Sequence, residues 1–127
     1  MVRTTKKQLS LANKAYPAVV VYLSALVDKR DLVIEGQDLG RAVASVWGDS
    51  DYEYWLTVDR KHLDRVIAGL GRKLGHEVEM PSEHSDRDAL LVDLLKESWQ
   101  EGLFETDGDF RRWLNTIHVP SKFSSYA

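Results

Sequence analysis

The chain of 127 residues contains no cysteine. A disulfide framework and a zinc site built on thiolates are therefore excluded. Long apolar runs are also missing: the longest, from Ala15 to Val27, is shorter than the roughly 20 residues that a membrane-spanning helix needs. The charged sequence "VDKRD" follows that run, at the place where a signal peptide would end in small residues. We therefore expect a cytoplasmic protein without a membrane segment.

The composition, 43% hydrophobic and 29% charged, is typical of an ordinary globular protein. This length suffices for one hydrophobic core, and no repeat or linker divides the chain. Residues 1–14 form a basic N-terminal segment, which is either a short capped helix or a frayed end. Residues 15–127 are expected to form a single globular domain.

The net charge of −3 is small, but the charged residues are unevenly distributed. Residues 1–30 and 60–74 are basic, whereas residues 31–59 and 75–110 are acidic. Charge blocks of this kind more often form solvated faces than a dedicated charged surface. They do not select one class of partner by themselves.

The periodicity of apolar residues predicts an α+β fold in which about four helices pack on a small sheet of two or three strands. Residues 32–35 and 51–58 are typical of strands, and residues 121–126 are a candidate edge strand. The expected helices are 17–27, 63–74, a segment from a Ser85–Asp88 capping box to Gly102, and 110–117 after a Thr106–Asp109 capping box.

The segment 17–27 is ambiguous between helix and strand. Pro17 suits the first turn of a helix, and Val20, Leu23 and Val27 recur at helical spacing. Ser24 interrupts that apolar face, and the sequence "VVVY" has a high strand propensity. We favour a helix here.

The strand at residues 51–58 carries aromatic residues on both faces. Tyr52 and Tyr54 alternate with Glu53 and Trp55, so the two kinds of residue point to opposite sides of the sheet. If both sides are covered, Trp55 belongs to the core, which is the interpretation that we favour because a small domain needs its apolar area. If only the tyrosine side is covered, Trp55 lies on an open, acidic surface.

No residue pattern specifies a metal site or a cofactor, and none is expected. His76 and His84 lie among acidic residues and are weak candidates for a metal site, but their spacing matches no metal motif. A polar connection between helices explains the same composition. The sequence "GLGRKLG" is as rich in glycine as a phosphate loop, but it ends a helix where such a loop would begin one.

Catalytic motifs are also missing. The chain has no G-x-S-x-G elbow, and no order of serine, histidine and acid indicates a triad. Asp51 and Glu53 share a strand face and could serve as an acid and a base, although solvation of a strand end explains them as well. We lean away from an enzyme, and a small enzyme with an unrecognised site is the third hypothesis.

A protein-binding module is the leading hypothesis. In size, composition and lack of motifs the chain resembles, by class only, immunity proteins and antitoxins, which neutralise toxins through surface complementarity. The expected partner is a basic protein, and the expected contact surface lies in the acidic segments 49–53 and 77–109. The residues expected to bind it are Trp47, Asp49, Asp51, Glu53 and Trp55.

The alternative is a nucleic-acid-associated regulatory protein. Its phosphate contacts would come from the basic N-terminal arm, with Arg3, Lys6, Lys7 and Lys14, and Lys29 and Arg30 could add to them. The overall acidic balance of the chain makes this a weaker hypothesis than protein binding.

Overall fold

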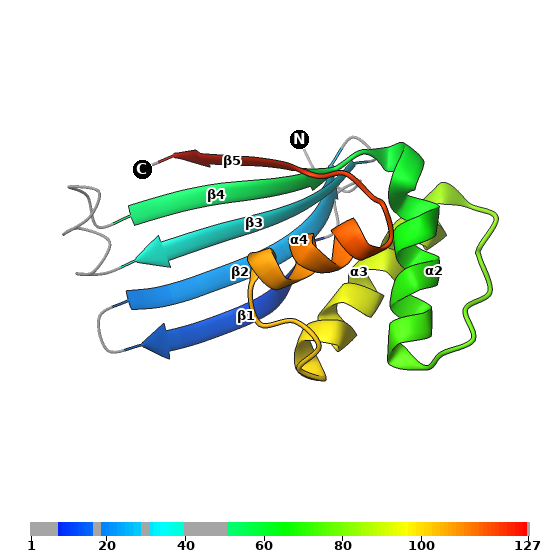
Figure 1. Cartoon of the computed structure of the whole chain (residues 1–127), viewed down its shortest axis with the longest axis horizontal. Helices are drawn as coiled ribbons and strands as arrows, with labels where there is room; N and C mark the ends of the chain where they lie inside the picture. The colour runs from blue at the N-terminus through cyan, green and yellow to red at the C-terminus, as the bar shows by residue number, and fades with distance from the viewer. Residues whose placement is uncertain (1–7, 17–18, 29–30, 40–50, 127) are drawn as a thin grey trace.

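The computed structural model describes residues 8–16, 19–28, 31–39 and 51–126. These residues form one antiparallel sheet of five strands in the order β1-β2-β3-β4-β5, with α-helices that follow β4 (Figure 1). The elements are β1 (Gln8–Tyr16), β2 (Val19–Asp28), β3 (Asp31–Leu39), β4 (Asp51–Val58), the 3-10 helix η1 (Arg60–His62), α2 (Leu63–Leu74), α3 (His84–Gln100), α4 (Asp107–Thr116) and β5 (Lys122–Tyr126).

The α+β class is confirmed, but the predicted balance of four helices on a two- to three-stranded sheet is wrong. The sheet has five strands, and the described residues contain three α-helices. Most of the segment 17–27, predicted as a helix, lies in β2 and pairs with β1 on one side and β3 on the other. Leu23, Ala25 and Val27 are buried on one face of this strand. Ser24 points to the opposite face, so the residue that interrupted a helical stripe fits the alternation of a strand.

β1 is an edge strand that the sequence did not predict, and it takes up residues 8–14 of the basic N-terminal segment. Its pairing with β2 shifts by one residue between Ser10 and Ala12, which is the geometry of a β-bulge. At this bulge the Lys96 ammonium group of α3 donates a hydrogen bond of 3.1 Å to the Ser10 carbonyl. The edge strand is therefore attached both to the sheet and to the helix layer.

One face of the sheet and the helices share a single hydrophobic core. On the sheet side, Leu32 and Ile34 of β3 lie opposite Val58 and Leu56 of β4, and all four side chains are at most 1% exposed. The helices supply the other half of the core, chiefly through Val66, Ile67, Leu70, Leu91, Leu95, Phe110 and Leu114. The helices predicted at residues 63–74 and 110–117 are present as α2 and α4, and this core packs them against the sheet.

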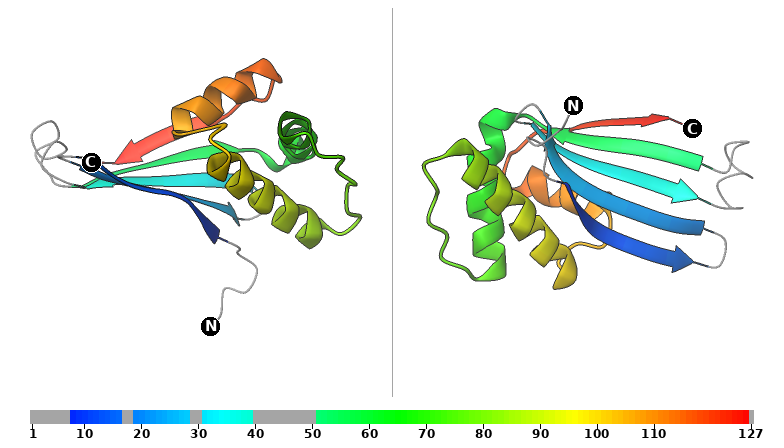
Figure 2. Two further views of the ribbon diagram at one scale, coloured as in Figure 1. Left: turned by 90° about the horizontal axis from the view of Figure 1, so that it is seen from below. Right: turned by 180° about the vertical axis from the view of Figure 1, so that it is seen from behind.

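The opposite face of the sheet carries no helix among the described residues, as the view from behind makes clear (Figure 2). Trp55 lies on this face and is half-buried. Our preferred interpretation, that Trp55 belongs to the core, is therefore wrong. Tyr54, its neighbour in the chain, is the residue that enters the core.

Local sequence signals define most helix ends. The Thr106–Asp109 capping box is present at the start of α4, and Gly75 ends α2 in the left-handed conformation with φ of 76°. The predicted Ser85–Asp88 capping box is wrong, because α3 begins at His84 with Glu83 before it and no side-chain cap. In the described part of the chain, no helix combines the length and apolar character needed to span a membrane.

Gly36 and Tyr54 pack closely across neighbouring strands on the helix side of the sheet. They face each other in the register of β3 and β4, and the Tyr54 ring lies directly over the glycine. A Cβ atom at Gly36 would lie 2.0 Å from the Tyr54 Cε2 atom, well inside van der Waals contact. The Tyr54 hydroxyl then donates a hydrogen bond of 3.0 Å to Asp38, which fixes the ring along β3.

Replacement Gly36→Ala should therefore displace the Tyr54 ring and destabilise the fold. Overpacking of this kind typically costs about 1–3 kcal/mol. Urea denaturation would measure the change in the free energy of unfolding. The matched control is Gly108→Ala in α4, where the nearest atoms to an added Cβ lie 3.6 Å away, so this variant should be at least as stable as the wild type. Equal stability of Gly36→Ala and the wild type would contradict the packing described.

Candidate functional site

The uncovered sheet face is built from side chains that the strand register places side by side. Cross-strand partners point to the same face, so two adjoining rows of residues cross the sheet. The first row is Ser10, Ser24, Glu35, Trp55 and Ser124, and the second is Tyr22, Gln37, Glu53 and Tyr126. We call these two rows the open sheet face.

The open sheet face is hollowed and aromatic. A cavity of about 310 Å³ lies over it, lined by residues of both rows from β1 to β4. Trp55, which is half-buried, and Tyr22, which is 41% exposed, line the cavity, and Tyr126 of the second row is 70% exposed. Exposed aromatic side chains grouped around a concavity are typical of binding surfaces rather than of solvated sheet faces.

The electrostatic character of the open sheet face is acidic. Glu35 pairs with Trp55 across the strands, and Glu53 pairs with Gln37 in the next row. Both carboxylates therefore border the indole ring. The described basic residue nearest in register is Lys122, which pairs with Thr57 at the β5 edge of the adjoining row.

The predicted partner-binding residues are only partly brought together. Glu53 and Trp55 lie on the open sheet face and line its cavity. Asp51 is the first residue of β4, and Trp47 and Asp49 lie outside the described residues. Tyr22 and Glu35 were not predicted, because they join Trp55 only through the pairing of β2, β3 and β4.

The two histidines considered for a metal site lie in different places. The His76 Nε2 atom is 2.5 Å from a Glu97 carboxylate oxygen of α3. His84 lines a separate cavity at the start of α3. Within the described ranges, no group of three or more histidine, aspartate or glutamate side chains is arranged to hold a metal ion.

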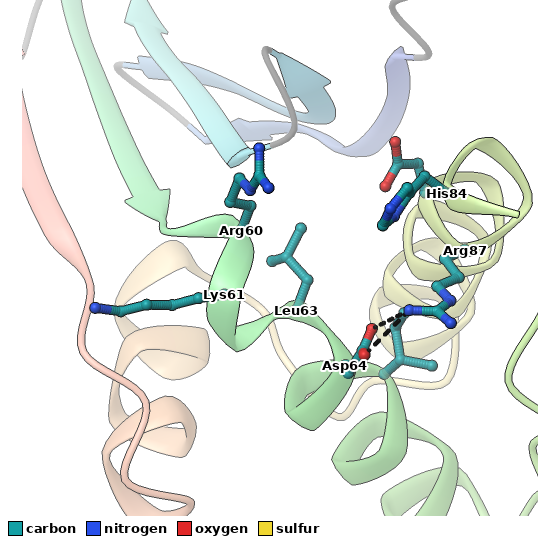
Figure 3. Close-up of a pocket in the computed structure, with 8 residues that line it drawn as sticks. Arg60, Lys61, Leu63, Asp64, His84 and Arg87 are labelled. Atoms are coloured by element: carbon teal, nitrogen blue, oxygen red, sulfur yellow. Dashed lines mark hydrogen bonds and ion pairs between the residues drawn. The ribbon is translucent and has the colours of Figure 1, made fainter. Parts of the chain in front are cut away.

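The cavity beside His84 has mixed charge. It measures about 230 Å³ and lies between η1, the start of α2 and the start of α3 (Figure 3). Arg87 is already engaged there, because it pairs with Asp64 at 3.2 Å and donates to the Pro81 carbonyl. The protein's own groups therefore already neutralise part of the positive charge at this cavity. Arg60 also lines the cavity, and its backbone N–H donates a hydrogen bond to the Asp31 carboxylate.

The nucleic-acid hypothesis relies on basic residues near the N-terminus. Arg3, Lys6 and Lys7 lie outside the described residues, and Lys14 is part of β1.

A group of partly buried acids that the sequence did not predict lies on the helix side of the sheet. Burial raises the pKa of the Asp38 carboxyl, the hydrogen bond from Tyr54 lowers it, and the charge of Asp107 raises it further. Burial also raises the pKa of Asp107, whose carboxylate is partly compensated by backbone N–H groups of the first turn of α4. The Tyr54 hydroxyl, buried beside Asp38, has its pKa raised as well.

The only sequence signal for this group was the alternation of β4, which assigns Tyr54 to the face opposite Trp55. The approach of Asp107 depends on how α4 packs over the sheet, which no local pattern contains. We assign this group an electrostatic effect on stability.

Replacement Asp38→Asn should stabilise the protein at neutral pH. Because the pKa of Asp38 is raised in the fold, its contribution to stability is full below about pH 4, the ordinary range of an aspartate, and is lost as the pH rises through the raised pKa. An asparagine keeps an acceptor for Tyr54 without the charge. Denaturation at pH 3.5 and pH 7 should show a gain over the wild type that is larger at pH 7.

Asp109 provides a control, because its pKa is shifted in the direction opposite to that of Asp38. Hydrogen bonds from the Glu105 and Thr106 backbone N–H groups lower its pKa, so its stabilisation is present at neutral pH and is lost as the pH falls. Asp109→Ala should cost about 1 kcal/mol at pH 7 through loss of the capping box, and less at pH 3. The same pH trend in both variants would contradict the assignments.

No protein-family model, curated protein or solved structure matches the chain in comparisons of its sequence and fold. What the chain binds must therefore be inferred from its own surfaces, of which the open sheet face combines the exposed aromatic residues Tyr22 and Tyr126 with the carboxylates Glu35 and Glu53.

Proposed function

We propose that this chain is a non-enzymatic protein-binding module that holds a basic protein partner against its open sheet face. In this role it would resemble immunity proteins and antitoxins, which neutralise their targets by covering them. The observation that carries the proposal is a five-stranded sheet whose second face is uncovered by any described helix and carries Trp55 between Glu35 and Glu53.

The chemistry of this face favours a basic protein over other partners. Trp55 and Tyr22 supply rigid apolar area, which is what anchors most protein interfaces. Glu35 and Glu53 would repel the phosphates of a nucleic acid but attract arginine and lysine side chains. Arginine in particular can pair with a carboxylate and stack on an indole ring at the same time.

The rows across the sheet also limit the shape of the partner. The hollow extends across four strands, because residues from β1 to β4 all line it. A convex element, such as a basic helix or a projecting loop, would fill this hollow better than an extended strand. Complementarity of shape rather than a chemical motif would then determine specificity.

The first experiment is recovery of partners from native cell extract at low and high salt, followed by titration of the purified partner. A single basic protein that binds in fixed stoichiometry and dissociates at high salt is expected. Trp55→Ala should weaken its binding at least tenfold, and Glu53→Lys should weaken binding and reduce its dependence on salt.

Glu101→Lys provides the matched control for the charge change, since Glu101 is exposed at the end of α3, away from the open sheet face. This variant should bind like the wild type. Binding unaffected by either change on the open sheet face would refute the proposed surface. Recovery that is sensitive to nuclease would indicate the nucleic-acid hypothesis instead, and a blank at both salt concentrations would count against a protein partner.

A further inference from the structure

A second concavity lies on the helix layer, between α3 and the connection that joins α2 to α3. It measures about 330 Å³, which is at the lower end of the range for ligand pockets and suits one or two apolar side chains. We call it the acidic groove. It is separate from the open sheet face, because none of its lining residues belongs to the sheet.

The floor of the acidic groove is apolar. Leu90 and Leu94 lie one turn apart on α3, and Val78 approaches them from the connection. Leu94 is buried, whereas Leu90 and Val78 are half-buried and contact the space of the groove. Met80, which follows in the connection, is 36% exposed, and methionine at a binding surface adapts to partners of different shape.

The connection is held in place by a close contact with α2. Val78 packs on Gly71, where an added Cβ atom would lie 2.4 Å from the Val78 Cγ2 atom. The hydrogen bond of 2.8 Å from the His76 backbone N–H to the Gly71 carbonyl fixes the start of the same segment. The floor is therefore formed before any ligand arrives, which lowers the entropic cost of binding.

The rim of the acidic groove is strongly negative. Four carboxylates line it, from Glu77, Glu79, Asp93 and Glu97. The only ion pair that an acid of the rim makes within the described part of the chain is the contact of 2.5 Å between Glu97 and His76. An excess of carboxylates around an apolar floor complements a ligand that carries both cationic and apolar groups.

We propose that the acidic groove binds a basic peptide segment that places a leucine-sized apolar side chain on the floor and lysine or arginine side chains on the rim. Within the described residues no three acidic or histidine side chains are arranged to hold a metal ion, and the four carboxylates disfavour an anionic ligand. A short segment fits better than a folded surface, because the groove runs between one helix and one extended connection. This inference does not rest on the proposed function of the open sheet face.

The test uses two fluorescein-labelled synthetic peptides, one of alternating lysine and leucine and one in which serine replaces every leucine. The leucine peptide should bind at least tenfold more tightly by fluorescence anisotropy. Asp93→Lys should reduce its affinity at least tenfold, and Leu90→Gln should remove the preference for leucine. Asn115→Lys, which adds a positive charge at an exposed position of α4 outside the acidic groove, should leave the affinity unchanged.

Amide chemical shifts of the wild-type protein provide a readout that needs no variant. Addition of the leucine peptide should move the signals of Val78, Leu90 and Leu94. Equal affinity for the two peptides would overturn the proposal, because binding would then be electrostatic only. Shifts confined to Tyr22 and Trp55 would also overturn it and would leave the open sheet face as the site for basic partners.

Discussion

Burial on one side of the sheet is the constraint on which the rest of the structure depends. The described helices cover only one face, so alternate residues of β3 and β4 are assigned either to the core or to the outside. A shift of one residue in the pairing would exchange Tyr54 and Trp55 between the two environments. The contact between Tyr54 and Gly36 opposes such a shift, because only glycine leaves room for the ring at that register.

Much of the helix layer could be predicted from the sequence, whereas much of the sheet could not. The apolar spacing of α2 and the Thr106–Asp109 capping box are local signals, and both were confirmed. In β2, Val20, Leu23 and Val27 match a helical spacing only because the strand is apolar on more than one side. A central strand such as β2 has a continuous apolar run, and periodicity alone does not distinguish such a run from a buried helix. β1 had no comparable signal, since its pairing is made by backbone groups rather than by an apolar pattern.

For the candidate surfaces, too, local sequence patterns predict one part, and the pairing and packing of distant segments determine the other. The alternation of β4 predicts that Glu53 and Trp55 share a face, but it does not tell which face the helices cover. Glu35 and Tyr22 become neighbours of Trp55 only through strand register. In the acidic groove, Val78 and Leu94 are brought together by the return of the chain after α2, so the acidic composition was visible in the sequence and the apolar floor was not.

The order of the strands has a consequence for how the sheet is completed during folding. β1 to β4 pair with their neighbours in the chain, but β5 pairs with β4 across all three described α-helices. Until residues 122–126 arrive, β4 is a sheet edge whose backbone N–H and C=O groups lack partners on one side. Closing a loop of this length is slower than forming a hairpin. During synthesis, β4 would therefore present an unpaired edge until residues 122–126 are made, and the Glu53 carboxylate on that strand would oppose pairing with another chain.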